Sequence, residues 1–242
     1  MKTIEINGTI IPNDEQEFYD WFGIEAVSPK KVKAELKEAN GEDITVKVNS
    51  GGGDLWAGNE ISYELSTYAG TVVADVTGIA ASAATVICCG ADRVRMSPGA
   101  QYMIHNVSSF AVGDHNEMDK MSGILHNADK ATSNVYRKKT GLSSKKLLEL
   151  MDEETWMDAD KAIKYGFVDE IIGDSERDTK TPDSFTLQNA TPKCILLTEE
   201  QKAEAKAALQ KAGEDGKERI RLMQNQLTFL SLKGGISHVQ EL

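Results

Sequence analysis

The stretch TVVADVTGIAASAATVICCG (residues 71–90) joins an apolar segment to a run of small residues around one hydroxyl side chain, Ser82. Its first part, TVVADV (71–76), has the β-branched composition typical of a strand. The part from Ser82 onward predicts a helix, and the first turn of a helix leaves its backbone amides unpaired. The stretch therefore predicts a strand, a turn and a helix, with the hydroxyl of Ser82 beside free N–H groups at the turn.

The segments before this stretch repeat the alternation of strand and helix patterns. The residues TIEINGTI (3–10) and ITVKV (44–48) predict strands. Helices are predicted over 30–40, after a Ser-Pro start signal, and over 55–69, where apolar residues recur at helical spacing. This alternation predicts an α/β protein with a largely parallel sheet and right-handed crossovers. In such a fold the active cleft is expected beyond the carboxyl ends of the strands.

Composition narrows the classes of protein to consider. The 242 residues, 40% of them hydrophobic, allow one substantial core and an appendage. The net charge of −11, with Lys and Arg interspersed among acidic residues, argues against a nucleic-acid partner. The three cysteines (Cys88, Cys89 and Cys194) form no CxxC pair, so we expect a reducing compartment and no metal centre. With neither an apolar leader nor an 18-residue apolar run, we expect a cytoplasmic protein without membrane contact.

Two glycine-containing loops are predicted after neighbouring strands, NSGGGD (49–54) and TGIAAS (77–82). Consecutive glycines permit positive φ and let a substrate backbone approach closely, and their N–H groups can donate to an anion or an extended peptide. A flexible turn is the alternative interpretation. Neither loop has the GxxxxGK[ST] or GxGxxG pattern, so nucleotide binding is not predicted.

Ser82 is a candidate nucleophile and His105 the candidate base. Small neighbours on both sides of Ser82 permit close packing and leave the Ala83 amide available as an oxyanion donor. An ordinary N-cap serine is the alternative. His105 ends the predicted strand QYMIH (101–105), whereas the other three histidines lie in polar or amphipathic stretches. A structural role at the strand end is the alternative for His105.

Four motifs in order resemble the proteolytic subunit family of Clp protease, serine peptidases with a crotonase-like fold: NSGGGDLWAG (49–58), GIAASAA (78–84), YMIHN (102–106) and ETWMDADKAIKYGFVDEI (154–171). The resemblance implies repeated ββα units, a handle helix and no cofactor. It also implies Ser82 as nucleophile and His105 as general base. In the same way it implies Gly53 and Ala83 as oxyanion-hole donors, with Gly52 beside them in the substrate-binding loop.

Two positions depart from the family pattern. The position at which the family commonly has aspartate is Glu154, whose longer side chain can orient a histidine only from a backbone that lies farther back. Asp152 and Glu153 remain rivals, and a solvated acidic helix end is the alternative for all three. Gly51 stands where the family often has proline, which predicts a less preorganised oxyanion loop.

The rest of the chain suggests assembly and an extension. Residues 114–139 match the family's handle helix, which implies stacking into a homo-oligomeric ring through apolar residues at helical spacing: Met118, Met121, Ile124, Leu125 and Ala128. We expect a protease domain over 1–173, a polar linker over 174–197 and a helical extension over 198–242.

Three functions stay open. The first is a Clp-type serine endopeptidase, and the tail and the ETWM motif resemble bacteriophage head-maturation proteases that trim scaffold and capsid proteins. Any ATP dependence would require a separate AAA+ ATPase, because the chain has no P-loop. The second is a crotonase-like enzyme acting on acyl-CoA. The third is a non-catalytic assembly protein.

Overall fold

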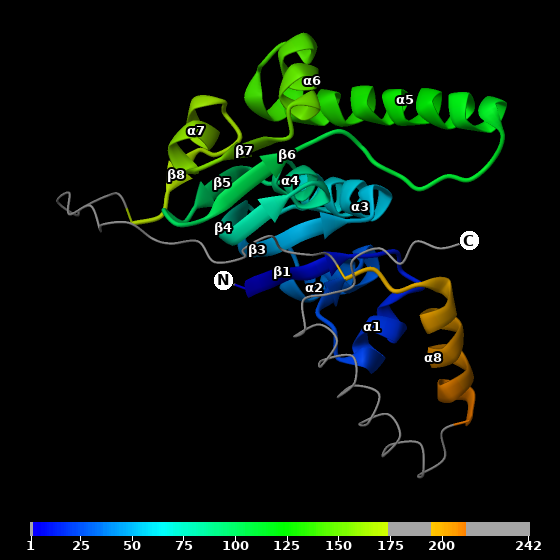
Figure 1. The fold of residues 1–242 in the computed structure, drawn as a ribbon. Coiled ribbons are helices and arrows are strands. Elements are labelled where there is room, and N and C mark those ends of the chain that lie inside the picture. Colours follow the sequence, from blue (N-terminus) through cyan, green and yellow to red (C-terminus); the bar gives the residue numbers. More distant parts are fainter. Residues whose placement is uncertain (1, 174–194, 212–242) are drawn as a thin grey trace.

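The computed structural model describes residues 2–173 and 195–211, and a mostly parallel sheet with helices packed against it forms its centre (Figure 1). Six strands lie in the order β2-β1-β3-β4-β5-β8, with bounds Ala26–Val27, Lys2–Ile10, Ile44–Gly53, Val72–Ala81, Arg93–Met96 and Glu170–Ile171. Two more lie beside this path: β6 (Gln101–Ile104) pairs with the end of β4, and β7 (Thr155–Met157) pairs with β6. Only the β6–β7 pairing is antiparallel among the described strands.

Eight helices are present among the described residues. Their bounds are α1 Gln16–Phe22, α2 Pro29–Ala39, α3 Leu55–Ser66, α4 Ala83–Cys88, α5 His115–Thr140, α6 Ser144–Asp152, α7 Ala159–Lys164 and α8 Glu199–Lys211. The predicted α/β class is confirmed. None of the described helices is long and apolar enough to cross a lipid bilayer.

Local sequence signals set several of these boundaries. The α2 helix begins with Pro29 at its first position and ends where Asn40 adopts a left-handed conformation, with φ 50°. The long α5 helix begins at a capping box, in which Asp114 accepts from the amides of Asn116 and Glu117 and the Glu117 side chain accepts from the Asp114 amide. These signals are readable in the sequence because they act within one turn.

Both strands beside the candidate site run farther than predicted. The β3 strand continues through the three glycines to Gly53, because Thr9 and Ile10 of β1 pair with Gly52 and Gly53. The glycine run is therefore paired sheet rather than a free loop. The β4 strand likewise continues to Ala81, so Ser82 lies directly between the end of β4 and the first residue of α4.

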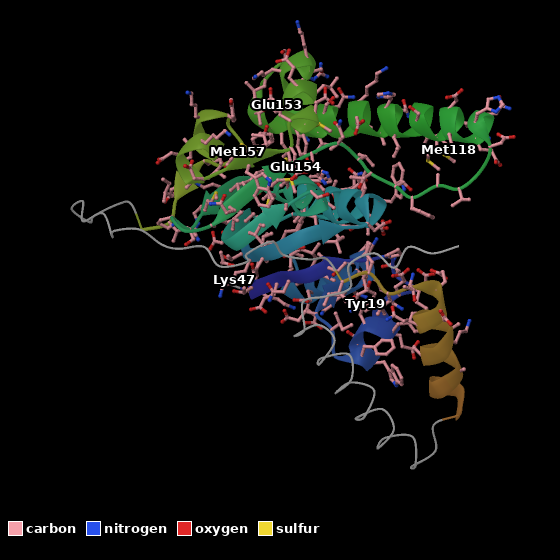
Figure 2. The ribbon with its side chains drawn as sticks, in the orientation of Figure 1. Tyr19, Lys47, Met118, Glu153, Glu154 and Met157 are labelled. Carbon is pink, nitrogen blue, oxygen red and sulfur yellow. The ribbon has the colours of Figure 1, made fainter. Side chains whose placement is uncertain are left out.

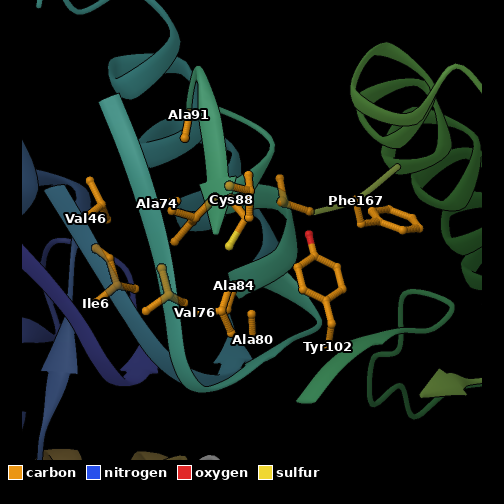
Figure 3. Close-up of a cluster of buried hydrophobic side chains, with 14 of the residues drawn as sticks. Ile6, Val46, Ala74, Val76, Ala80, Ala84, Cys88, Ala91, Tyr102 and Phe167 are labelled. Atoms are coloured by element: carbon orange, nitrogen blue, oxygen red, sulfur yellow. The ribbon is translucent and has the colours of Figure 1, made fainter. Parts of the chain in front are cut away.

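The core lies where α4 covers the sheet (Figure 3). Val46 and Val76 of the strands and Ala84 of α4 have no or almost no exposed surface. The rings of Tyr102 and Phe167 lie against each other with centroids 5.3 Å apart. This cluster fixes α4, and with it Ser82, against the sheet.

The chain beyond residue 173 is described only over 195–211. Most of the predicted linker (174–197) and of the predicted extension (198–242) lies outside the described residues, so these domain boundaries stay predictions. In the described part, α8 lies beside α1 (Figure 1).

We predict that Phe167→Ala lowers the free energy of unfolding by about 3–5 kcal/mol, because it removes a fully buried ring and leaves a cavity. Urea denaturation followed by fluorescence measures the change. The control is Phe110→Ala, since Phe110 is 88% exposed and its removal should leave the denaturation midpoint nearly unchanged. Equal effects of the two substitutions would contradict the described core.

Candidate active site

Ser82 and His105 lie side by side because the strands that carry them are paired. Ala81, at the end of β4, is in register with Met103 of β6, and the Ser82 amide continues the ladder by donating to the Met103 carbonyl at 3.0 Å. His105 follows the last residue of β6. The Ser82 Oγ and the His105 Nε2 are 2.8 Å apart, which is hydrogen-bond distance.

The backbone of Ser82 has an unusual conformation, with φ 53° and ψ −125°. A non-glycine residue rarely adopts positive φ, and such strain, about 1–3 kcal/mol, is typical of functional turns. Although Ser82 occupies the N-cap position of α4, its side chain makes no capping hydrogen bond. The hydroxyl instead contacts the imidazole, as on the strained strand-to-helix turn of serine hydrolases.

A second layer behind Ser82 holds this turn in place. The Thr85 hydroxyl donates to the Ser82 carbonyl at 2.5 Å and lies 2.7 Å from the hydroxyl of Tyr136, on α5. Thr85 and Tyr136 are both buried. Sequence reasoning missed this layer: Thr85 carries only the weak signal of a hydroxyl three residues after Ser82, and no local pattern points to Tyr136.

Gly52 and Gly53 bring the β3 backbone against the turn at Ser82. Their φ values of 101° and 144° suit glycine. A Cβ on Gly52 would lie 2.8 Å from the Cβ of Ser82 and 3.1 Å from the amide nitrogen of Ala83, and a Cβ on Gly53 would lie 2.1 Å from the Ile10 carbonyl oxygen. The Ser50 hydroxyl holds this segment by accepting from the Gly52 amide and donating to the Gly8 carbonyl. Side chains are thus sterically excluded from this edge of the site.

The three candidate acids lie at the passage from α6 to β7, and all are exposed. Asp152 accepts a hydrogen bond from the Asn106 side chain at 2.7 Å, and Glu154 accepts one from the Trp156 indole at 3.2 Å. In Figure 2, Glu153 lies beside α6 and Glu154 lies closer to the sheet. Within residues 2–173 and 195–211, no hydrogen bond joins the His105 ring to any of the three carboxylates.

Pairing register nevertheless distinguishes Glu154. Ile104 of β6 is opposite Thr155 of β7, so continuing this register by one residue would bring Glu154 opposite His105. Residues directly opposite each other in an antiparallel pair have neighbouring side chains. Glu154 has φ 48°, so the chain leaves the strand conformation at this residue.

A cavity of about 600 Å³ opens beside the Ser82–His105 pair. Such a volume is typical of a ligand site. Gly53 and Ala83 line it, as do Asn106 and Thr132. The buried oxygens Asn106 Oδ1 and Thr132 Oγ1 have no hydrogen-bond partner in the part of the chain that the structure describes. Unpaired buried polar atoms are rare in native proteins, so these two side chains mark a polar region of the cavity lining.

The other histidines and the cysteines that the structure describes do not line the cavity. Burial raises the pKa of the Cys89 thiol to about 12 and that of the Cys88 thiol further, so both are protonated near neutral pH. His115 and His126 are exposed on α5, and His238 lies outside the described residues. No cluster of three or more His, Cys, Asp or Glu suited to a metal ion occurs among the described residues.

The chain is similar to known proteins in both sequence and fold. A family model described as Clp protease matches residues 30–175. The ATP-dependent Clp protease proteolytic subunit of Streptococcus mutans is 33% identical over 141 residues, which cover 57% of this chain and 72% of that protein. The ATP-dependent Clp protease proteolytic subunit 1 of Chlamydia abortus is 29% identical over 136 residues, which cover 54% and 71%. The solved structure of a ClpP1 mutant from Listeria monocytogenes superposes with a TM-score of 0.57 and 26% identity, covering 70% of this chain and 90% of that one.

We predict that Gly53→Ala strongly lowers the rate at which a fluorophosphonate labels Ser82, because the new Cβ would displace the β3 backbone from Ile10. Intact-protein mass spectrometry measures the rate. Gly99→Ala is the matched control, since nothing lies within 4 Å of the position of its added Cβ. Labelling of the Gly53 variant at the wild-type rate would contradict a role for this backbone in the site.

Proposed function

The chain belongs to the Clp protease family of serine endopeptidases, and we propose that it cleaves polypeptides with Ser82 as nucleophile, His105 as general base and Glu154 as the orienting acid. The observation that carries the proposal is the 2.8 Å contact between the Ser82 hydroxyl and the His105 ring, at the edge of a cavity. A hydroxyl needs such a base within hydrogen-bond reach to become a nucleophile.

The proposed reaction is acyl transfer in two stages. His105 Nε2 takes the proton of Ser82 Oγ as the oxygen attacks the peptide carbonyl carbon. The tetrahedral intermediate collapses when the same imidazole returns the proton to the leaving amine nitrogen and the C–N bond breaks. Water, deprotonated by His105, then attacks the ester carbonyl, and the Ser82–acyl bond breaks to release the carboxylate and the restored hydroxyl.

Backbone amides of Gly53 and Ala83 are the proposed oxyanion donors. Three observations support this assignment. Both residues line the cavity with Ser82, and Ala83 is the first residue of α4. The neighbouring Gly52 packs directly against the turn at Ser82. Amides fixed by the sheet and the helix need no reorganisation when charge develops on the carbonyl oxygen.

Glu154 is proposed as the acid because the β6–β7 register brings its backbone toward His105. Rotation of its side chain away from the Trp156 indole would free the carboxylate to accept from His105 Nδ1. Catalytic hydrogen bonds often form only in the substrate complex. Asp152 is the rival, although its carboxylate is bonded to Asn106.

The same geometry bears on the two other candidate functions. An acyl-CoA enzyme of crotonase type uses the backbone oxyanion hole and has no need of a bonded Ser–His pair. A non-catalytic assembly protein has no need of the strained Ser82 backbone, which costs stability. The Ser82–His105 contact therefore favours peptidase chemistry over both.

The proposed setting is a homo-oligomeric ring acting on proteins. Large apolar side chains outside the cavity lining are exposed on α5 and on the segment leading to it: Val112 and Met118. Exposed large apolar side chains favour a protein–protein contact where they lie together on a surface. We propose that the substrates are scaffold and capsid proteins during bacteriophage head maturation, or proteins delivered by a separate AAA+ ATPase.

We predict that Ser82→Ala abolishes fluorophosphonate labelling and cleavage of casein or of a co-expressed capsid protein, because the nucleophilic oxygen is removed. Mass spectrometry and gel analysis measure the two effects. Ser66→Ala is the matched control, because Ser66 is exposed at the end of α3 and does not line the cavity. Unchanged cleavage of casein or of the capsid protein by the Ser82 variant would contradict the peptidase proposal. Turnover of acyl-CoA would support the crotonase alternative.

We predict that Glu154→Gln lowers kcat for a peptide substrate by about 10²-fold or more, because the developing imidazolium loses its stabilising charge. Asp152→Asn and Glu153→Gln are the matched controls and should stay within a few-fold of wild type. A larger loss in either control than in the Glu154 variant would reassign the acid to that residue.

A further inference from the structure

A segment outside the matched family region contributes to the cavity. The family model matches residues 30–175, yet Leu196, Leu197 and Lys202 line the same cavity as Ser82 and His105. We name residues 195–211 the C-terminal arm. In Figure 1 the arm passes close to the N-terminal part of the sheet and continues as α8 beside α1.

Apolar burial and backbone hydrogen bonds both hold the arm. Leu197 and Ala205 are buried in a second small core with Tyr19 and Phe22 of α1. The Tyr19 hydroxyl donates to the Ile195 carbonyl at 2.9 Å and accepts from the Leu197 amide at 3.3 Å. Because the Ile195 and Leu197 groups that bond to Tyr19 belong to the backbone, these two bonds fix the path of the arm independently of its exposed side chains.

An ion pair adds to this attachment. Lys202 donates to Glu15, just before α1, and to Glu199 at 3.0 Å. Burial by itself lowers the pKa of Lys202, but its hydrogen bonds to the two carboxylates outweigh this and raise the pKa above its ordinary value. Lys202 is therefore positively charged near neutral pH. Its charge is already paired with Glu15 and Glu199.

The cavity wall that the arm completes is mainly apolar. Leu196 is 67% exposed and lines the cavity. Apolar residues of other elements line it as well: Ile10, Leu55, Val86, Met121, Ile124 and Leu125. Of the charged lining residues, Glu15 is paired with Lys202, and Asp54 accepts from the Ala57 amide without a cationic partner. Among the residues that the structure describes, the wall thus offers contact to an apolar side chain and no unengaged positive charge for an acidic one.

We infer that Leu196 of the C-terminal arm is a specificity-determining residue, which contacts an apolar side chain of the polypeptide substrate in the cavity beside Ser82. The inference rests on the proposed peptidase function. It adds a subsite built from a segment of this chain that the family model does not cover. Burial of the substrate side chain against Leu196 favours apolar over acidic residues at one substrate position.

The test uses peptidyl diphenylphosphonates that carry either leucine or aspartate at one position at a time. Their second-order rates of Ser82 modification, measured by intact-protein mass spectrometry, give the leucine-to-aspartate preference at each position. We expect Leu196→Ala to reduce this preference about fivefold at one position. Ile195→Ala is the matched control, because Ile195 is an exposed neighbour in the arm that does not line the cavity, and it should leave every preference unchanged.

A small fluorophosphonate without a peptide distinguishes failure of the Leu196 subsite from failure of the proposed peptidase function. The subsite is supported if this probe labels Ser82 equally in all variants and the leucine-to-aspartate preference is reduced only in Leu196→Ala. Equal labelling with identical preferences in wild type and Leu196→Ala overturns the subsite and leaves the peptidase function standing. Absence of Ser82 labelling by any probe overturns the peptidase function, and the subsite falls with it.

Discussion

The parallel pairing of β4 with β6 is the contact on which the candidate site depends. It joins strands that end one residue before Ser82 and one residue before His105, so two side chains 23 positions apart reach hydrogen-bond distance. The Ser82 amide takes part in the same ladder through the Met103 carbonyl. Backbone hydrogen bonds therefore fix both partners, and neither depends on a flexible loop for its position.

The second constraint on the candidate site is the close approach of the β3 backbone to the turn at Ser82. The paired glycine run of β3 lies against the turn at Ser82, where a side chain on Gly52 would contact both Ser82 and Ala83. Behind the turn, Thr85 and Tyr136 tie α4 to the long α5 helix. The strained conformation of Ser82 persists because the surrounding sheet and core determine it from both sides.

The cavity combines elements of the matched family region with a segment outside it. The Ser82 turn, the glycine run and the β6 end lie within the matched region, while Leu196 and Leu197 lie outside it. Tyr19 and Lys202 fasten this outer segment through backbone bonds and an ion pair. A family core of this kind can keep its chemistry while an added segment changes which substrates fit.

The sequence by itself determined the α/β class, the start signals of α2 and α5, and the identity of Ser82, His105 and the glycine run as candidates, because these follow from neighbours within a few residues. It did not reveal that the glycines are paired strand, that Thr85 and Tyr136 support the turn, or that the arm reaches the cavity. It also left the acid open among three adjacent carboxylates. Such features depend on contacts between segments up to 187 positions apart, as between Glu15 and Lys202. Only the register of the sheet and the packing of the tertiary structure set those distances, since no local pattern encodes them.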